Sequence, residues 1–442
     1  MRFKLQYWLI PIFLVVGFFL VKASMPRYTG LYWLSTLLIL GDIYLWSVFR
    51  KKIFGYNLPV RVFLIGLYWL SLFSVFFIFI GAAVVPVMQW NDVFRTYLFG
   101  FVFSVYTAKL FPILFYLLAD FSAFIKKTFH LTDKKKRELI LKEREGITRS
   151  KFLHYLGFLS GGMVLSTMFI GMFKWEYEYR VVRQKLKISG LPPGFKNLKI
   201  VHISDFHLGN WGLMKPMLEA IKTIKALKPD LIVFTGDLVT YSTKETERFG
   251  DLLSEIKAPL GVYTVLGNHD YGLYVTWPNK EAEKKNMEDL YDYYDKIGWT
   301  LLNNENVILE KGSDKLAIVG VENWGKGKRF PKFGDIDQAM QGVEEVPVKI
   351  LLSHDPSHWD LVVVPGQYSI DLTLSGHTHG FQFGLETPKM KWSPAQYVFK
   401  HWAGLYQDPK TGQYLYVNRG IGSIGYPGRI GILPEITLLE LV

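Results

Sequence analysis

The sequence predicts an α/β domain preceded by an all-α, multi-span transmembrane region. Long apolar segments fill the first 173 residues, and a segment of about 20 apolar residues is long enough to cross a bilayer. The remaining residues contain five short runs rich in Val, Ile and Leu, with helical spacing between the first three. Each short run is followed at once by a small polar signature. The two parts of the chain are therefore expected to differ in surroundings as well as in fold.

The five short runs have the length and composition of buried β-strands. They cover residues 198–204, 231–235, 262–266, 348–352 and 371–375. Good helix formers, such as Met214–Leu227, lie between the first three runs, which is typical of βαβ units and a largely parallel sheet. The carboxyl ends of such strands line one edge of the sheet, where ligands bind. We therefore expect the polar signatures to meet in one crevice.

The signatures contain carboxylate, amide and imidazole groups, and the chain has no cysteine. They read Asp205-Phe-His207, Gly236-Asp237, Gly267-Asn-His-Asp270, Ser353-His354-Asp355 and Gly376-His-Thr-His379-Gly380. Nitrogen and oxygen ligands without thiolate suit Mn, Fe or Zn. The candidate ligands are too many for one ion and suit two ions that share a bridging carboxylate. Two such ions can clamp a phosphoryl group and supply hydroxide near neutral pH.

These signatures, in this order, resemble the calcineurin-like metallophosphoesterase superfamily over residues 196–442. The final segment, from Tyr414 to Leu441, resembles the membrane-associated YkuE/YaeI-like branch. The resemblance implies a two-sheet α/β metallophosphoesterase sandwich flanked by helices, with two divalent metal ions at the strand ends. It also implies a hydrolase that cleaves phosphate esters by in-line attack of hydroxide generated at the metals, without a covalent intermediate.

The resemblance further implies which residues would bind the two ions. The first ion would be held by Asp205, His207 and His379. The second would be held by Asn268, His354 and His377, and Asp237 would bridge the two.

The resemblance gives His269 a catalytic role instead, as a general acid or a stabiliser of phosphate charge. Asp270 would orient the His269 ring and favour its protonated form. Three other histidines, His202, His358 and His401, lie outside the motif positions and are expected to be packed or hydrogen-bonded within the fold.

The charge of the chain is distributed very unevenly. The formal net charge is +12, but residues 1–173 carry 20 Lys+Arg against 7 Asp+Glu, whereas residues 174–442 carry 31 against 32. A nucleic-acid enzyme would be expected to have a basic catalytic domain, so nucleic acid is not expected as a partner. The excess in the first part is typical of membrane topology. No obligate protein partner is indicated.

Five segments are long and apolar enough to cross a bilayer, near residues 6–21, 31–49, 62–88, 96–119 and 152–173. The expected organisation is four spans in residues 1–125, a basic cytoplasmic loop at 126–151, an anchoring span at 152–173, a juxtamembrane linker at 174–195 and a catalytic domain at 196–442. Lys and Arg are concentrated in the second and fourth loops. If those loops are cytoplasmic, five crossings place the catalytic domain outside the cytoplasm, on a multi-pass protein of the cell (inner) membrane.

Two charged residues, Asp42 and Lys109, lie near the middle of apolar segments. A lone charge at that depth costs at least about 2.5–3.5 kcal/mol. We expect the two to face each other within the helical bundle; the alternative is that each finds water or a backbone partner separately.

Outside the metal motifs the sequence leaves several alternatives open. The alternation in Arg180–Ile188 predicts an antiparallel strand. Lys326, Lys328 and Arg419 are candidate substrate-phosphate contacts, although the loop with the two lysines also fits an ordinary exposed loop. The aromatic stretch Met390–Tyr406 fits either a lip that rests on the membrane or takes an acyl chain, or core beneath a long loop.

Together these features predict a membrane-anchored, binuclear metal-dependent phosphoesterase. It would hydrolyse phosphate monoesters, diesters or pyrophosphates, and its location favours membrane lipids and a lipid-linked substrate. The alternatives are a phosphodiesterase acting on soluble nucleotides or cell-wall phosphodiesters, and a non-catalytic membrane sensor or scaffold.

Overall fold

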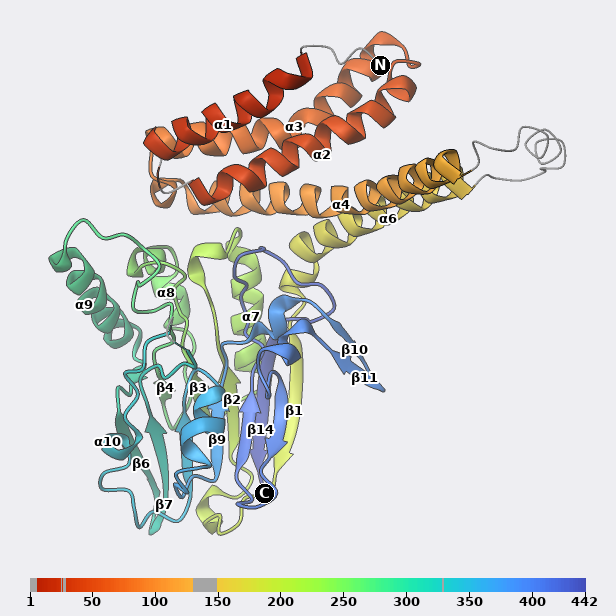
Figure 1. Cartoon of the computed structure of the whole chain (residues 1–442). Coiled ribbons are helices and arrows are strands. Elements are labelled where there is room, and N and C mark those ends of the chain that lie inside the picture. Colours follow the sequence, from red (N-terminus) through yellow and green to blue (C-terminus); the bar gives the residue numbers. More distant parts are fainter. Residues whose placement is uncertain (1–5, 25, 27–28, 130–148, 328–329) are drawn as a thin grey trace. The chain divides into compact units, whose positions relative to one another are not determined.

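The structure, a computed structural model, describes residues 6–24, 26, 29–129, 149–327 and 330–442 (Figure 1). The chain divides into two compact units, Met1–Phe169 and Ile170–Val442. Most of the expected basic loop at 126–151, and the whole of Lys328, lie outside the described residues.

The first unit consists of long helices. They are α1 (Gln6–Ser24), α2 (Thr29–Ile53), α3 (Leu58–Val84), α4 (Asp92–Phe129) and α6 (Arg149–Phe173), with a 3₁₀ turn at Val87–Gln89; the last four residues of α6 belong to the second unit. Asn57 caps α3 by accepting a hydrogen bond from the Val60 N–H, and a proline follows in the first turn.

Four segments of the described residues are long and apolar enough to cross a membrane: Tyr32–Ile53, Leu58–Val84, Asp92–Ile125 and Arg149–Tyr177. They correspond to four of the five expected spans. The remaining expected span corresponds to α1, whose described side chains, Leu14–Ser24, form a shorter apolar helix.

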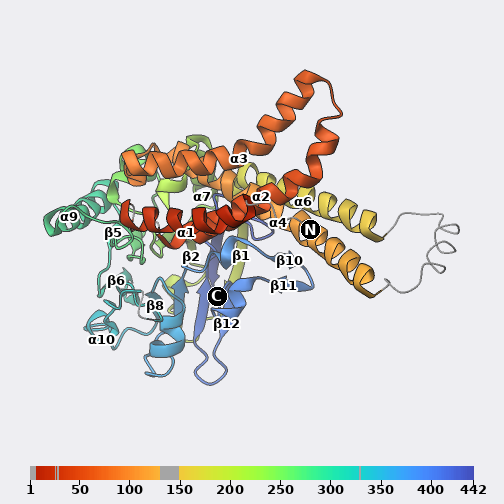
Figure 2. The ribbon, with the colours of Figure 1, turned by 45° about the horizontal axis from the view of Figure 1, so that its top comes forward.

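Helices α4 and α6 run side by side in both views (Figures 1 and 2). Gly157 and Gly161 of α6 lie against α4 at Pro112, and a Cβ at Gly161 would come within 2.9 Å of the Pro112 ring. Small residues four positions apart allow such close backbone approach between membrane helices.

The expected pairing of Asp42 with Lys109 is confirmed. Lys109 Nζ lies 2.6 Å from Asp42 Oδ1, and the Asp42 residue is 1% exposed. Tyr106 donates to the other Asp42 oxygen at 2.7 Å, and Lys109 also donates to Ser71 Oγ at 2.7 Å. The two charges are therefore neutralised and hydrogen-bonded within the bundle.

The second unit contains two six-stranded sheets and a two-stranded hairpin. The first sheet has the order β1 (Arg180–Leu186), β14 (Glu435–Leu441), β2 (Lys199–Ile203), β3 (Leu231–Phe234), β4 (Val262–Thr264), β5 (Thr300–Leu301). The second has the order β12 (Gly404–Gln407), β13 (Tyr414–Val417), β9 (Leu372–Ser375), β8 (Lys349–Leu352), β7 (Asp314–Gly320), β6 (Glu305–Lys311). The hairpin is β10 (Leu385–Thr387) and β11 (Met390–Trp392).

The strands that lead to the polar signatures are parallel within each sheet, as the sequence predicts: β2, β3 and β4 in one, β8 and β9 in the other. The helices of this unit are α7 (Met214–Ala226), α8 (Gly250–Leu253), α9 (Lys280–Ile297) and α10 (Ile336–Ala339). Single helical turns lie at Trp175–Tyr177, Pro193–Phe195, Leu208–Asn210, Thr243–Arg248, Trp359–Val363, His379–Gln382 and Pro394–Tyr397.

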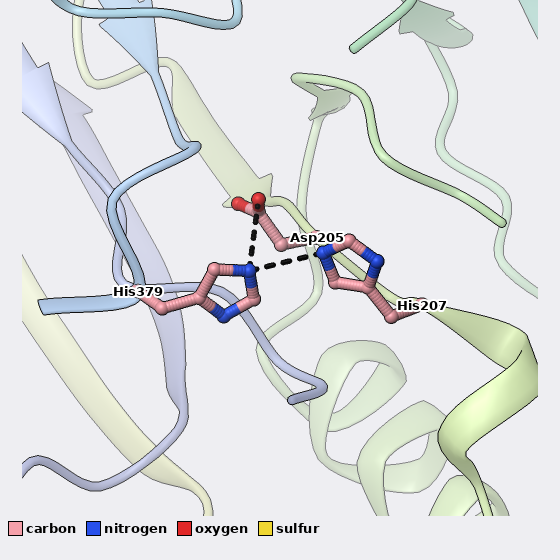
Figure 3. A group of neighbouring side chains, drawn as sticks. All are labelled: Asp205, His207 and His379. Carbon is pink, nitrogen blue, oxygen red and sulfur yellow. Dashed lines mark hydrogen bonds and ion pairs between the residues drawn. The ribbon is translucent and has the colours of Figure 1, made fainter. Parts of the chain in front are cut away.

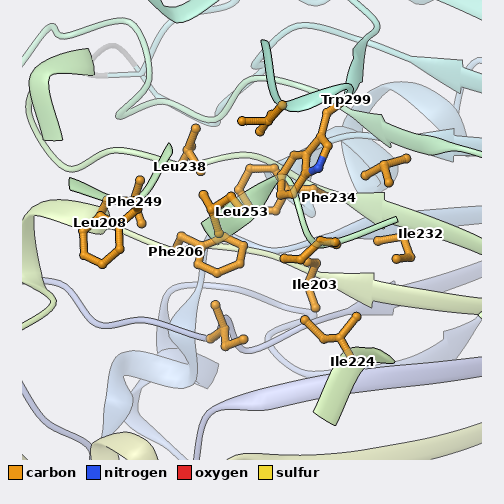
Figure 4. Packing of buried hydrophobic residues seen from close by; sticks show 14 of the residues in the cluster. Ile203, Phe206, Leu208, Ile224, Ile232, Phe234, Leu238, Phe249, Leu253 and Trp299 are labelled. Carbon is orange, nitrogen blue, oxygen red and sulfur yellow. The ribbon is translucent and has the colours of Figure 1, made fainter. Parts of the chain in front are cut away.

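Three layers of apolar side chains fill this unit. Alternate residues of the strands, such as Ile200 and Leu374, form a core between the two sheets. The opposite face of the first sheet packs on α7, α8 and α9, with Phe234 and Trp299 at its centre (Figure 4). The outer face of the second sheet packs on α10 and the turn at Trp359–Val363. Both faces of the central strands are thus buried, which explains why these strands read as continuous apolar runs.

The predicted direction of the first strand was wrong. β1 pairs in parallel with β14, from Arg180 opposite Glu435 to Leu186 opposite Leu441. β1 is the edge strand of its sheet and mixes exposed with partly buried side chains. An exposed face produces the same alternation in a parallel edge strand as in an antiparallel one.

Candidate metal centre

Every expected metal-binding residue lies just beyond the carboxyl end of a central strand. Asp205 and His207 follow β2, Asp237 follows β3 and Asn268 follows β4. In the other sheet, His354 follows β8, while His377 and His379 follow β9. Strands of both sheets therefore contribute, and the residues gather at the edge where ligands bind in parallel sheets.

The first group of side chains is Asp205, His207 and His379 (Figure 3). Their ligand atoms all lie within 4.8 Å of one another. The Nε2 atoms of His207 and His379 are 3.0 Å apart, and Asp205 Oδ1 lies 3.3 Å from His379 Nε2. All three side chains are buried.

The second group is Asp237, His354 and His377. His354 Nε2 lies 3.1 Å from Asp237 Oδ2 and 3.2 Å from His377 Nδ1. His354 uses its other ring nitrogen to bond the Thr235 carbonyl at 2.6 Å. That bond places a proton at Nδ1 and turns Nε2 towards Asp237, as hydrogen bonds to the other ring nitrogen of metal-binding histidines do.

Asp237 links the two groups. Its Oδ2 atom is 3.1 Å from His354 Nε2 in the second group and 3.6 Å from His207 Nε2 in the first. One carboxylate thus reaches both, which is the geometry expected of a bridging ligand.

The protonation of these residues suits cation binding. Burial alone would raise the pKa of Asp205, but His379 and other neighbouring imidazoles lower it below its ordinary range. Burial lowers the pKa values of His207 and His377, which keeps those rings neutral with lone pairs to offer. Burial also opposes protonation of His354, but Asp237 outweighs it and raises the pKa of His354 to about 10. A metal cation beside Asp237 would displace that proton.

Asn268 provides an independent test of fit. Its Nδ2 atom donates to the Tyr274 hydroxyl at 2.8 Å, whereas its Oδ1 atom is buried and has no hydrogen-bond partner among the described residues. A buried carbonyl oxygen without a donor is costly unless a cation binds it. The residues present therefore fit two divalent ions.

The expected role of Asp270 was wrong. Its carboxylate accepts four backbone N–H groups, from Gly267, Asp237, Leu238 and Val239. The His269 ring instead bonds the Thr240 carbonyl through Nδ1 at 2.8 Å. Burial lowers the pKa of His269, so the surroundings do not favour the protonated ring as the sequence suggested.

The three substrate-contact candidates have different outcomes. Arg419 is 3% exposed, and its guanidinium pairs with Glu435 at 2.5 Å and Glu386 at 2.6 Å, so the expectation that it contacts phosphate is corrected. Lys326 is exposed and lines a cavity of about 300 Å³. Lys328 lies outside the described residues.

The three histidines expected to be structural are so. His202 is buried and bonds Thr235 Oγ1 at 2.9 Å. His358 bonds Ser353 Oγ at 2.9 Å, and His401 lies 3.0 Å from Asp360.

Sequence reasoning missed two residues that touch the centre. Tyr274 holds Asn268, and its ring lies 4.3 Å from that of His269. Arg429 is fully buried, and its Nη2 atom lies 3.4 Å from His379 Nδ1. Neither stands in a motif; a buried arginine in a glycine-rich segment gives no signal until its neighbours are known.

Comparison with known proteins agrees with this geometry. Residues 198–381 match the family described as calcineurin-like phosphoesterase. The metallophosphoesterase YkuE of Bacillus subtilis, described as uncharacterized, is 33% identical over 262 residues, which cover 58% of this chain and 83% of that protein. The chain belongs to the calcineurin-like phosphoesterase family. It is therefore a metallophosphoesterase, a hydrolase of a family that uses divalent metals, and the predicted two-sheet fold is confirmed.

The helical region has relatives as well. Residues 30–175 match the family described as probable calcineurin-like phosphoesterase, transmembrane domain. A transmembrane protein with metallophosphoesterase domain from Danio rerio is 25% identical over 430 residues, 95% of this chain and 90% of that protein. The UDP-2,3-diacylglucosamine pyrophosphatase LpxG of Chlamydia trachomatis is 30% identical over 56% of this chain and 87% of its own length. This metallophosphoesterase is thus a membrane protein.

Proposed function

We propose that this membrane metallophosphoesterase hydrolyses a phosphate ester or pyrophosphate bond of a lipid-linked substrate, with its catalytic unit outside the cytoplasm. The observation that carries the hydrolytic part is the position of Asp237, whose single carboxylate lies within 3.6 Å of imidazole nitrogens from both groups. Asp205, His207 and His379 would hold one divalent ion, Asn268, His354 and His377 the other, and Asp237 both. Mn, Fe or Zn suits these ligands.

Two ions bound there would clamp the phosphoryl group, supply hydroxide for attack and stabilise the leaving oxygen. The chain's own residues would do the rest. The bond from His269 Nδ1 to the Thr240 carbonyl fixes the ring and leaves Nε2 for the substrate. Negative phosphate charge beside the ring would raise its pKa, so that Nε2 holds a proton for the leaving oxygen. The backbone N–H of His269 donates to Asp237 Oδ1 at 2.8 Å, which fixes the position of this residue relative to the bridging carboxylate.

The lipid-linked substrate is supported by three observations. The chain spans a membrane, and a relative 30% identical is named for a diacylated sugar nucleotide. A cavity of about 300 Å³ lies beside His377, whose ring contacts two rings of the cavity wall, Phe330 at 5.2 Å and Phe399 at 5.4 Å. The cavity wall also carries Lys326, and Lys400 in an ion pair with Asp360 at 3.1 Å. Apolar and cationic side chains together suit a phosphate attached to an apolar group.

The test uses detergent-purified protein with Mn²⁺ and extracted membrane lipids, and follows the release of phosphate or headgroup. The wild type should release product, whereas His269→Ala should lower the rate by about 10²–10⁴-fold while keeping two ions per chain by elemental analysis. Asp237→Asn should lose both activity and bound metal. Full activity in Asp237→Asn would overturn the ligand assignment. Hydrolysis of soluble phosphodiesters but of no lipid would support the bridging site and overturn the substrate class.

The orientation of the catalytic unit is tested separately by cysteine labelling, which is specific because the chain contains no native cysteine. Lys410 lies in the exposed β12–β13 turn and is replaced by Cys. Intact cells that carry this variant are then treated with a membrane-impermeant maleimide. Labelling before lysis supports an extracytoplasmic catalytic unit; labelling only after lysis would contradict it.

A further inference from the structure

The catalytic unit has an exposed apolar surface around the β10–β11 hairpin. We define it by six side chains that are each between 37% and 76% exposed: Phe381, Phe383, Leu385, Met390, Trp392 and Tyr397. The hairpin projects from the rest of the unit in both views (Figures 1 and 2). A contiguous exposed apolar patch usually marks a binding surface.

Four of the six side chains form one set of contacts around Trp392. Leu385 stands opposite Trp392 in the hairpin register. The rings of Phe383 and Trp392 are 6.2 Å apart, and Tyr397 OH lies 3.5 Å from Trp392 Nε1. Other parts of the same aromatic stretch are core: Trp402 is buried with Ala395, Ala403 and Ile432. The alternative of core beneath a long loop therefore holds for Trp402 and its neighbours, but not for the exposed residues of the surface.

Two ion pairs of Glu386, the middle residue of β10, hold the hairpin in place. Glu386 Oε2 lies 2.6 Å from Arg180 Nη1 and 2.6 Å from Arg419 Nη1. The hairpin is therefore anchored to β1 and to the segment that follows β13, while its apolar side chains stay outside the core. The fold thus keeps these apolar side chains exposed.

A short chain of contacts connects this surface to the end of a membrane span. Gly171, within the span Arg149–Tyr177, accepts a hydrogen bond from the Arg429 N–H at 3.2 Å. A Cβ on Gly171 would lie 3.2 Å from Ile430, and Ile430 forms a parallel bridge with Phe383. All of these residues belong to the second unit. The apolar surface thus begins two contacts away from Gly171, within the last two turns of the span.

One member of this surface, Phe381, leads towards the metal centre. Phe399 lies between them, with its ring 6.2 Å from that of Phe381 and 5.4 Å from that of His377. Phe399 also lines the cavity beside His377. Phe399 therefore connects one member of the apolar surface, Phe381, with a histidine of the second metal group.

We propose that this surface docks into the interfacial layer of the bilayer that the chain spans. Its composition of Trp, Tyr and Phe, with the exposed Lys389 at the hairpin turn, is that of side chains enriched at membrane interfaces. The connection to Gly171 keeps it at the boundary of the membrane, where lipid is the available apolar partner. On the proposed function, docking would let a lipid-linked phosphate reach the metal centre along Phe399 without leaving the bilayer.

The test measures membrane depth, using the absence of native cysteine. Trp392→Cys, Tyr397→Cys and the control Lys410→Cys are each labelled with an environment-sensitive fluorophore in full-length protein, in nanodiscs of phosphatidylethanolamine and phosphatidylglycerol. Lys410 lies in the turn between Gln407 and Tyr414, at the end of its sheet away from the metal groups. A headgroup nitroxide lipid is then added as a quencher.

A surface inserted about 5–10 Å into the headgroup region should make emission at both apolar positions fall about twofold or more, while the control changes little. Quenching no greater than at Lys410 would overturn the proposal, whether the surface is then covered by a second copy or by another protein. Two labelling positions guard against a variant that fails to fold, which is checked by its melting temperature. Because no catalysis is measured, docking and the proposed hydrolysis can fail independently.

Discussion

Replacing Asp270 with Asn should destabilise the catalytic unit before it affects any proton transfer. Oδ1 of this buried carboxylate accepts from the N–H groups of Leu238 and Val239, at 2.8 and 3.2 Å. Oδ2 accepts from those of Asp237 and Gly267, both at 2.8 Å. An Asn side chain keeps one oxygen and turns an NH₂ group towards the other two N–H groups. Two buried donors are then unsatisfied, at about 1–3 kcal/mol each, so the expected loss is about 2–6 kcal/mol.

The loss is measured by thermal unfolding of detergent-purified protein in EDTA, which removes any contribution from bound ions. For a domain of this size each kcal/mol corresponds to about 2–4 °C, so the midpoint should fall by about 4–24 °C. Asp371→Asn is the matched control, because the Asp371 side chain accepts one backbone N–H, from Lys349 at 2.8 Å. Its midpoint should fall by about half as much or less.

Two results would refute this reasoning. One is an Asp270→Asn protein that unfolds at the same temperature as Asp371→Asn. The other is a stable Asp270→Asn protein whose activity shows a displaced pH profile, since that would restore a role in orienting the His269 ring. Loss of metal in a destabilised variant is expected, because Asp270 joins the loop that carries Asp237 to the loop that carries Asn268.

Three further predictions follow from contacts elsewhere in the molecule. Asp42→Asn and Lys109→Met should each cost about 3 kcal/mol in micelle unfolding, and the double variant clearly less than the sum; additive losses would show that the pair contributes nothing. Burial lowers the pKa values of His202 and His358 to about 4, whereas unfolded histidine titrates near 6.5. Between these values only the unfolded chain binds the extra protons, so the stability of metal-free protein should be full above pH 6.5 and fall towards pH 4, by about 3 kcal/mol per histidine. Denaturant titrations at each pH check this: the fall should be about 3 kcal/mol smaller in His202→Gln, and a flat wild-type profile would contradict the prediction. Finally, Gly376→Ala would overlap the Ser204 hydroxyl and the Asp205 carboxylate of the first metal group and should weaken metal binding about 10–100-fold by calorimetry; unchanged affinity would show that the loop adapts.

The parts of the fold that the sequence predicted depend on local patterns. Runs of Val, Ile and Leu are buried on both faces in a parallel sheet, so their limits mark the strands, and the residue after each run must lie at the sheet edge. That placed Asp205, Asp237 and His354 together although they are far apart in the chain. A similar argument predicted the pair in the helical region. A lone charge within a membrane span is costly, so Asp42 and Lys109 were expected to pair with each other.

The predictions that were wrong involve side chains whose partners come from distant elements. Arg419 forms ion pairs with Glu435 on β14 and with Glu386 on the hairpin, and nothing near Arg419 in the sequence indicates these partners. The direction of β1 depends on pairing with β14, at the other end of the unit. For Asp270, adjacency to His269 suggested a ring partner, but the turn directs its carboxylate to the amides of another loop.

The sequence also did not predict the backbone conformation at the metal centre. That conformation determines how the ligand side chains are oriented. Five of the seven predicted ligands have left-handed φ angles between 49° and 70°: Asp205, His207, Asp237, His377 and His379. This conformation costs roughly 1 kcal/mol or more for a residue with a Cβ, and it persists only where surrounding structure enforces it. Here the loops enforce it on one another: the Asp205 N–H donates to the Gly236 carbonyl at 2.9 Å, and the His207 N–H to the Asp237 carbonyl at 3.1 Å. Because these are protein–protein hydrogen bonds, the ligands are positioned before any ion binds, and little ordering remains to oppose metal binding.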